Sequence, residues 1–154
     1  MLGLEGKVAL VAGAGSVGEG WGNGKTTAVL MARQGAQVFG VDIDDEALGG
    51  TTARMDTEAL GANWASQRCN VTRSEDVGAA VAACLARFGR IDILVNNVGG
   101  SAPGDPVSMS EELWHRQIDL NLTSAFLGCK HVLPVRERQF ESRGWGGAIV
   151  NLSS

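Results

Sequence analysis

Hydrophobic and polar positions follow two alternating patterns along the chain. Five short runs have the length and character of strands, and several of them are apolar without alternation, as expected of strands that are covered on both faces of a sheet. These runs are Lys7–Ala12, Gln37–Val41, Trp64–Cys69, Ile91–Val95 and Ala148–Leu152. Between them, apolar residues recur at helical spacing. The alternation predicts an α/β fold with βαβ units, a parallel sheet and right-handed crossovers.

The helix starts are predicted from S/T-x-x-E sequences, which have the form of a capping box. Thr72–Glu75 precedes one amphipathic stretch, and Ser108–Glu111 opens a long helix that is expected to run toward Pro134. A polar loop is expected over Glu137–Gly147, and a further helix over Asp45–Leu60. No repeat or linker interrupts this order, so residues 1–154 are expected to form a single domain.

Composition and charge exclude several classes of protein. The chain is 44% hydrophobic and 19% charged, which is typical of a soluble globular domain, and its net charge of −4 gives no reason to expect nucleic acid or an anionic membrane as a partner. No apolar run approaches the roughly 18 residues of a membrane span. The three cysteines include no CxxC pair. We therefore expect reduced thiols in a cytoplasmic protein, with no disulfide and no metal site.

The segment Val11–Thr27, VAGAGSVGEGWGNGKTT, has a glycine at every second or third position from Gly13 to Gly24. Such spacing is typical of backbone that approaches a phosphate. A Walker A loop fails by one residue, because counting back from Gly24 places Glu19 where its first glycine should be. If GAGSVG opened the helix instead, three glycines would lie in the first turns, each costing about 1 kcal/mol. We expect the helix to begin near Asn23–Gly24 and to present its amides to an anion; a merely flexible turn is the alternative.

Four motifs in order then resemble the short-chain dehydrogenases/reductases. Ala12–Gly13 with Gly22 and Gly24 matches the family's T-G-x-x-x-G-x-G, with five additional residues. Asn96–Gly99 (NNVG), Asp119–Asn121 and the closing GGAIVNLSS match its later motifs. The resemblance implies a Rossmann-type doubly wound sheet of strand order 3-2-1-4-5. It also implies that the NAD-binding domain is C-terminally incomplete, because the chain has no Tyr-x-x-x-Lys motif and no tyrosine.

Ligands of such sheets bind beyond the carboxyl ends of the strands. Asp42 lies 18 residues past Gly24, near the spacing at which a carboxylate binds the adenosine ribose and repels a 2′-phosphate. No basic residue follows it closely, so NAD is predicted to bind in preference to NADP. The alternative interpretation of Asp42 is a solvated acid in an acidic loop. The resemblance implies that Asn70 contacts adenine. The alternative is that Asn70 has a purely structural role in a turn. The residues predicted to bind the cofactor are Gly13, Gly15, Ser16, Gly22, Asn23, Gly24, Asp42, Ile43, Asn70, Val71, Asn97, Val98 and Gly99.

The resemblance also implies the reaction, which is hydride transfer between an alcohol or ketone and the nicotinamide. It makes Asn121 the residue that holds a proton-relay water and Ser154 the residue that orients the substrate. His115 and His131 are predicted to be surface or packing residues. The complete form is expected to be a homo-oligomer, and these 154 residues alone are expected to be inactive. The alternative function is a non-catalytic nucleotide-binding fragment or truncated paralogue.

Overall fold

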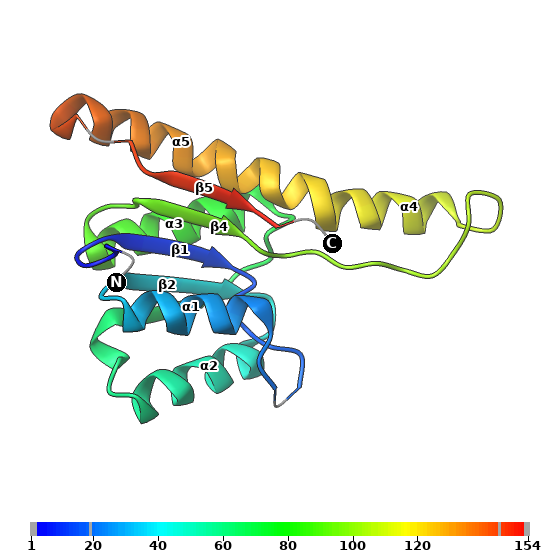
Figure 1. The fold of residues 1–154 in the computed structure, drawn as a ribbon. Helices are drawn as coiled ribbons and strands as arrows, with labels where there is room; N and C mark the ends of the chain where they lie inside the picture. The colour runs from blue at the N-terminus through cyan, green and yellow to red at the C-terminus, as the bar shows by residue number, and fades with distance from the viewer. Residues whose placement is uncertain (1–2, 19, 145, 153–154) are drawn as a thin grey trace.

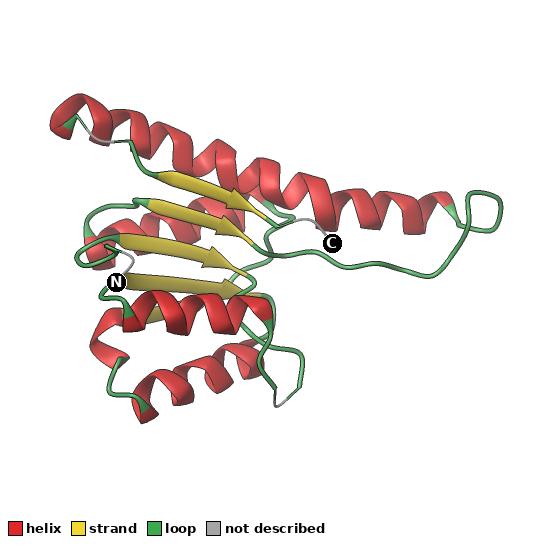
Figure 2. Cartoon of the chain, viewed as in Figure 1, coloured by secondary structure: helices red, strands yellow, loops and turns green. Residues whose placement is uncertain are grey.

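The computed structural model describes residues 3–18, 20–144 and 146–152, which form a five-stranded parallel sheet covered by helices (Figures 1 and 2). The strand order is β3-β2-β1-β4-β5, so the predicted fold and order are confirmed. The strands are β1 (Val8–Ala12), β2 (Gln37–Asp42), β3 (Trp64–Arg68), β4 (Ile93–Asn96) and β5 (Ala148–Asn151). The helices are α1 (Asn23–Arg33), α2 (Asp45–Thr57), the 3-10 turn η1 (Gly61–Asn63), α3 (Ser74–Phe88), α4 (Glu111–Ile118), the π-helical turn η2 (Asp119–Thr123) and α5 (Ser124–Arg143).

Each face of the sheet has its own hydrophobic core. Successive side chains of a strand point to opposite faces. In β1, Val8 and Leu10 therefore pack with α3 and α5, whereas Ala9 and Val11 pack with α1 and α2. Strand β1 is buried along its whole length, which explains its uninterrupted apolar sequence. Among the described residues, no helix is long and apolar enough to cross a membrane.

Neither predicted capping box forms. Helix α3 begins at Ser74 without a side-chain cap, because the Thr72 hydroxyl donates to Asn70 instead. Helix α4 begins at Glu111, where the Ser110 hydroxyl accepts a hydrogen bond from the Leu113 amide. Ser108 instead belongs to a turn around Asp105.

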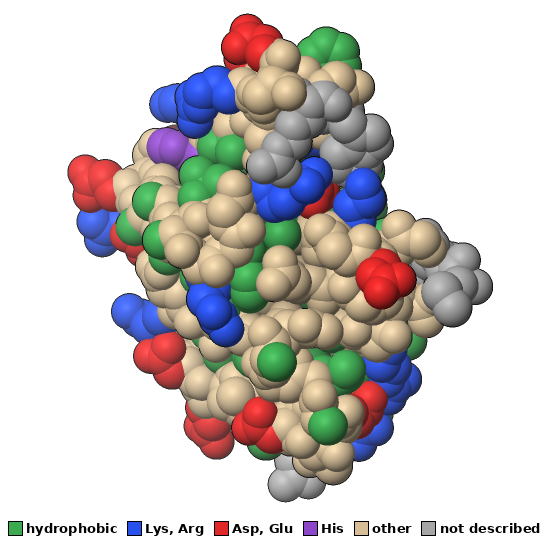
Figure 3. Space-filling model, turned by 90° about the vertical axis from the view of Figure 1, so that its left-hand side faces the viewer, with side chains coloured by type: hydrophobic (Ala, Val, Ile, Leu, Met, Phe, Trp, Pro, Cys, Tyr) green, Lys and Arg blue, Asp and Glu red, His purple; other side chains and the backbone are tan. Residues whose placement is uncertain are grey.

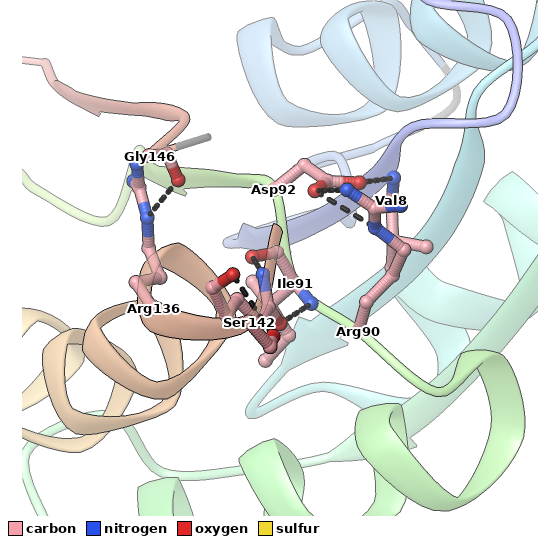
Figure 4. A network of polar contacts seen from close by, with 8 residues as sticks. Val8, Arg90, Ile91, Asp92, Arg136, Ser142 and Gly146 are labelled. Carbon is pink, nitrogen blue, oxygen red and sulfur yellow. Dashed lines mark hydrogen bonds and ion pairs between the residues drawn. The ribbon is translucent and has the colours of Figure 1, made fainter. Parts of the chain in front are cut away.

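The loop predicted over Glu137–Gly147 is also wrong, because α5 continues through Pro134 to Arg143. Tertiary contacts hold this part of the helix. Gln139 accepts a hydrogen bond from the Ile91 amide and donates one to the Ile91 carbonyl, both at 2.9 Å. Arg136 donates to the Gly146 carbonyl (Figure 4). The helix ends at Gly144, which has a φ of 67°.

A buried carboxylate lies at the amino end of β4 (Figure 4). Asp92 is fully buried, and it accepts hydrogen bonds from the Val8 amide at 2.8 Å and from the Arg90 Nε at 2.8 Å. The bond from Val8 joins the start of β4 to β1 at the end of the sheet opposite to the predicted cofactor site. On the molecular surface at this end, basic and acidic side chains are interspersed (Figure 3).

Candidate functional site: a groove at the carboxyl ends of the strands

A groove of about 1320 Å³ runs along the carboxyl ends of the strands. Its wall includes all thirteen residues that the sequence predicts to bind a cofactor, namely Gly13, Gly15, Ser16, Gly22, Asn23, Gly24, Asp42, Ile43, Asn70, Val71, Asn97, Val98 and Gly99. They come from the loops after β1, β2, β3 and β4 and from the start of α1. The fold therefore brings together residues that are separated by more than 80 positions in the sequence.

The amino end of α1 opens into this groove. Its N-cap residue, Gly22, makes no side-chain capping bond, and the first turn contains no acidic residue. In contrast, α2, α3 and α4 each carry two acidic residues in their first turns. Uncapped helix amides and the positive end of the helix dipole favour an anionic ligand. The start of α1 is therefore suited to bind phosphate groups.

Three residues fix the close approach of α1 to the end of β1. Gly13 has a φ of 72°, which an L side chain rarely adopts. A Cβ atom on Gly24 would lie 1.6 Å from the Gly13 carbonyl oxygen. The Asn97 side chain donates a hydrogen bond to that same oxygen at 3.0 Å, which joins the loop after β4 to the turn after β1. Asn97 thus positions the groove wall, in addition to lining it.

The Asp42 carboxylate lies at the end of β2 and is held by backbone amides. Its Oδ2 accepts a hydrogen bond from the Gly15 amide at 2.9 Å, and its Oδ1 accepts one from the Asp44 amide at 3.2 Å. A Cβ atom on Gly15 would lie 2.8 Å from this Oδ2. The absence of a side chain at Gly15 therefore lets the glycine-rich loop pack on the carboxylate that it orients.

The described part of the longer glycine-rich loop is held by a contact between its two ends. The Ser16 hydroxyl donates to the Gly20 carbonyl at 2.9 Å. The Trp21 ring lies 4.9 Å from the guanidinium carbon of Arg54 on α2 and 5.8 Å from Nζ of Lys25 on α1. Both contacts are within the range of cation–π interactions. Trp21 is therefore packed against α1 and α2, whereas Val17 in the same loop is fully exposed.

Several residues of this region were missed by sequence reasoning. Thr51 is fully buried, and its hydroxyl donates to the Ala14 carbonyl at 2.9 Å, which joins α2 to the loop after β1. Nothing in its sequence context marks this role. Lys25 and Thr72 line the groove; the position of Lys25 directly after Gly24 was the one signal that could have identified it.

Asn121 lies in the π-helical turn η2, between α4 and α5. Its Oδ1 accepts a hydrogen bond from the Gly100 amide at 3.0 Å, and its Nδ2 donates to the Gly100 carbonyl at 2.9 Å. The side chain therefore anchors the loop after β4, whose preceding residues Asn97–Gly99 line the groove. π-Helical turns occur frequently at functional sites. Ser154, the second predicted catalytic residue, lies outside the described residues.

The remaining polar and thiol groups near the site serve the fold. Asn96 donates to the Asn151 side chain at 2.8 Å and so joins β4 to β5. The His131 Nε2 lies 2.9 Å from the Ser74 hydroxyl and joins α5 to α3. Burial raises the pKa of the Cys69 thiol in the groove wall to about 11, so it is neutral at pH 7. The described part of the chain contains no cluster of His, Cys, Asp and Glu that could hold a metal ion.

Comparison with known proteins identifies the family. Residues 18–154 match a family model described as enoyl-(acyl carrier protein) reductase, of the short-chain dehydrogenase/reductase type. The chain belongs to the short-chain dehydrogenase/reductase family. The match covers most of the sequence and includes the groove-lining segments after β2, β3 and β4. Membership of an oxidoreductase family therefore rests on the same loops that build the site.

Individual relatives have different substrates in their names. The chain is 38% identical over 156 residues to D-threitol dehydrogenase of Mycolicibacterium smegmatis and 36% identical over 151 residues to 3-oxoacyl-(acyl-carrier-protein) reductase FabG of Thermotoga maritima. Each alignment covers 98% of this chain but only 54% and 56% of the relative, respectively. The chain thus spans just over half the length of these relatives.

The solved structures that resemble this chain also belong to short-chain dehydrogenases/reductases. A short-chain dehydrogenase/reductase from Burkholderia xenovorans is 50% identical, with a TM-score of 0.89, and covers 98% of this chain and 57% of its own. A short-chain dehydrogenase from Mycobacterium smegmatis is 33% identical, with a TM-score of 0.82, over 95% of this chain and 57% of its own. The fold of the described residues is therefore that of the matching part of these short-chain dehydrogenases/reductases.

Proposed function

We propose that this chain forms the NAD-binding site of an oxidoreductase that acts on a small alcohol or ketone. The observation that carries the proposal is the groove itself, which joins the uncapped amino end of α1 to the Asp42 carboxylate on one side and to Asn97–Gly99 on the other. An anion site, a ribose-binding carboxylate and a further polar wall are the three parts that a dinucleotide needs.

The parts of the cofactor are assigned to the groove as follows. The amides at Gly22–Gly24 bind the pyrophosphate, and the Asp42 carboxylate accepts hydrogen bonds from the adenosine ribose. The nicotinamide half lies toward Asn97–Gly99, on the far side of the phosphates. The nicotinamide supplies the hydride chemistry when it is bound. Asn121 positions the adjacent Gly100 backbone, and Ser154 is proposed to orient the substrate oxygen.

NAD is proposed as the preferred cofactor because Asp42 would repel a 2′-phosphate. The geometry supports this assignment, since the Gly15 and Asp44 amides hold the carboxylate in place at the end of β2. Lys25 also lines the groove, but its Nζ lies against α2, where a Cβ atom on Gly50 would be 3.9 Å away. We therefore assign selectivity to Asp42 and not to Lys25.

Calorimetric titration of the chain with NAD and NADP tests the proposal. Asp42→Ala is expected to weaken NAD binding about tenfold, as for the loss of one hydrogen bond to a charged group. It should also reduce the ratio of the NAD affinity to the NADP affinity. Asp45→Ala removes the same charge from an exposed residue outside the groove wall and should leave both affinities unchanged. Tighter binding of NADP by the unmutated chain would show that the assignment of Asp42 is wrong.

We also propose that the protein assembles as a homo-oligomer through α4, η2 and α5. Large apolar side chains are exposed along these elements, which are continuous in Figure 1. They are Trp114, Leu122, Phe126, Leu133 and Phe140. An exposed apolar surface of this kind is typical of a protein–protein interface.

A further inference from the structure

Thr51, in the middle of α2, turns its hydroxyl away from its own helix. A threonine inside a helix can donate to the carbonyl four residues earlier, and Thr52 and Thr57 do so at 3.0 and 2.8 Å. The Thr51 hydroxyl lies 3.4 Å from the corresponding Ala47 carbonyl but 2.9 Å from the Ala14 carbonyl, in the loop after β1. A hydroxyl has a single proton to donate, so we assign this proton to the shorter bond, which leads to the loop.

The bond between Thr51 and Ala14 is formed where water cannot replace it. Both residues are 0% exposed. Within the described residues, no other hydrogen-bond donor is found for the Ala14 carbonyl oxygen. A buried carbonyl that loses its partner costs more free energy than the bond itself contributes. The Ala14 carbonyl therefore depends on the Thr51 hydroxyl.

The peptide unit between Ala14 and Gly15 is held from both sides. The Ala14 carbonyl and the Gly15 amide belong to one planar trans peptide, so they point in opposite directions and rotate together. Thr51 binds the carbonyl, whereas the amide donates to Asp42 Oδ2 at 2.9 Å. A Cβ atom on Gly15 would lie 2.6 Å from the Ala47 Cβ, so this peptide packs directly against α2. Thr51 therefore fixes the direction of the N–H group that holds the Asp42 carboxylate.

We propose that Thr51 is a positioning residue for cofactor selectivity, which acts on Asp42 through the peptide between Ala14 and Gly15. This inference rests on the proposed function, in which Asp42 binds the adenosine ribose and repels a 2′-phosphate. Thr51 is buried and does not line the groove, so it acts without touching the dinucleotide. Its hydroxyl keeps the peptide from rotating, and the peptide keeps Oδ2 in one orientation before the ribose binds. Preorganisation of this kind favours binding.

Thr51→Val removes the hydroxyl and nearly preserves the shape of the side chain. The ratio of the NAD affinity to the NADP affinity is expected to fall about three- to tenfold, as for the loss of one hydrogen bond, because a peptide that can rotate no longer holds Asp42 toward the ribose. Thr51→Ser keeps the hydroxyl and should keep the ratio of the unmutated chain. The matched control is Thr52→Val, which removes the hydroxyl that accepts a bond from Trp64 Nε1, outside the groove wall, and should leave the ratio unchanged.

A double-mutant cycle separates positioning from a general effect on stability. If Thr51 acts through Asp42, Thr51→Val should change the ratio in the unmutated chain but not in an Asp42→Ala chain. A merely structural role would affect both dinucleotides equally and would leave the ratio unchanged. Hydrogen exchange of the Gly15 amide in the nucleotide-free chain gives a second reading, since a released peptide loses its protection. Exchange should become at least about tenfold faster in Thr51→Val, as for the loss of one hydrogen bond to a charged group, and should stay unchanged in Thr52→Val.

The experiment is calorimetric titration of these chains with NAD and with NADP, together with Gly15 exchange followed by NMR. A lower ratio in Thr51→Val, no such change in the Asp42→Ala background, and faster Gly15 exchange support the proposal. If Thr51→Val does not fold, Thr51→Cys, whose S–H is a weaker donor, takes its place with the same outcomes.

Three results would overturn this inference and leave the proposed function in place. They are an unchanged ratio in Thr51→Val, an equal change in Thr52→Val or in the Asp42→Ala background, and unaltered Gly15 exchange. If neither dinucleotide binds the unmutated chain, the proposed function fails, and this inference fails with it.

Discussion

Gly24 packs against the carbonyl oxygen of Gly13 so closely that a methyl group at Gly24 would lie 1.6 Å from it. The oxygen belongs to backbone and also accepts the Asn97 hydrogen bond, so it cannot move aside without opening the end of the sheet. The contact explains why the start of α1 reaches the groove. It also makes Gly24 the position at which a small substitution should have the largest effect.

Gly24→Ala is expected to lower the free energy of unfolding by about 3 kcal/mol or more, the upper range for overpacking of a core. The matched control is Gly49→Ala on α2, where a Cβ atom would meet nothing within 4 Å. Because alanine is favoured over glycine inside a helix, the control should gain about 0.5–1 kcal/mol. Urea denaturation of both variants checks the pair, and a Gly24→Ala chain as stable as the parent would contradict the packing described here.

Asp92→Ala should destabilise the opposite end of the sheet. The substitution leaves the buried Val8 amide without its acceptor and removes the Arg90 ion pair. Breaking a buried pair typically costs about 3–5 kcal/mol; since Arg90 is 25% exposed, the lower value is expected here. The same denaturation experiment on Glu112→Gln, which breaks the exposed Arg116–Glu112 pair, should show a change within about 0.5 kcal/mol. Equal effects of the two substitutions would rule out a special role for Asp92.

These 154 residues by themselves are expected to show no measurable dehydrogenase turnover with secondary alcohols. The sequence contains no tyrosine, His115 is exposed on α4, and His131 is paired with Ser74. Neither histidine lines the groove. General base catalysis contributes typically about 10²–10⁴-fold to the rate. The measurement is NADH formation by purified chain of verified mass, and production clearly above a no-enzyme control would refute the expectation.

The isolated chain is expected to self-associate at micromolar concentration. Strand β5 is an edge of the described sheet, with Val150 44% exposed, and Phe126 is 59% exposed on α5. An exposed strand edge and an exposed apolar helix both favour association. Light scattering should show oligomers, and Val150→Lys or Phe126→Glu should reduce their mass. Added NAD should reduce the self-association only modestly, since it stabilises the folded chain by mass action without covering the β5 edge or the apolar surface of α5.

A monodisperse monomer with a cooperative melt above about 55 °C, in the middle of the range for mesophilic domains, would contradict this expectation. Such a result would show that the five-stranded sheet is stable without a partner. It would also remove the support for assembly through α4, η2 and α5.

The sequence predicts most of the fold because the three central strands, β1, β2 and β4, are buried along most of their length. Val8–Ala12 is fully buried, so its apolar run marks the strand directly. The start of α1 was also predicted correctly, because glycines in the first turns would have been too costly. The end of α5 was not, since Pro134 and the polar residues after it favour a loop. Gln139 overrides that preference through two bonds to Ile91, a contact between residues 48 positions apart that no local pattern contains.

The residues that line the groove were predictable where they stand at or just after the carboxyl end of a strand. Asp42 and Asn70 both line the groove, as their positions after β2 and β3 predict. The tertiary partners of these residues were not predictable. Thr72 was interpreted as a helix cap, yet its hydroxyl donates to Asn70 and helps to orient that amide. Side chains that bind backbone several residues away leave no periodic signal in the sequence.

The packing of Trp21 between Arg54 and Lys25 has a practical consequence. The indole is 52% exposed and directly precedes Gly22, which lines the groove, whereas Trp64 is buried beneath Gly40 in the core. The additional residues of the glycine-rich loop thus place a natural fluorophore at the mouth of the groove. In a chain whose other three tryptophans are replaced, its emission reports on the polarity and cationic surroundings of that loop, so movement of the loop can be followed in solution without attaching a label.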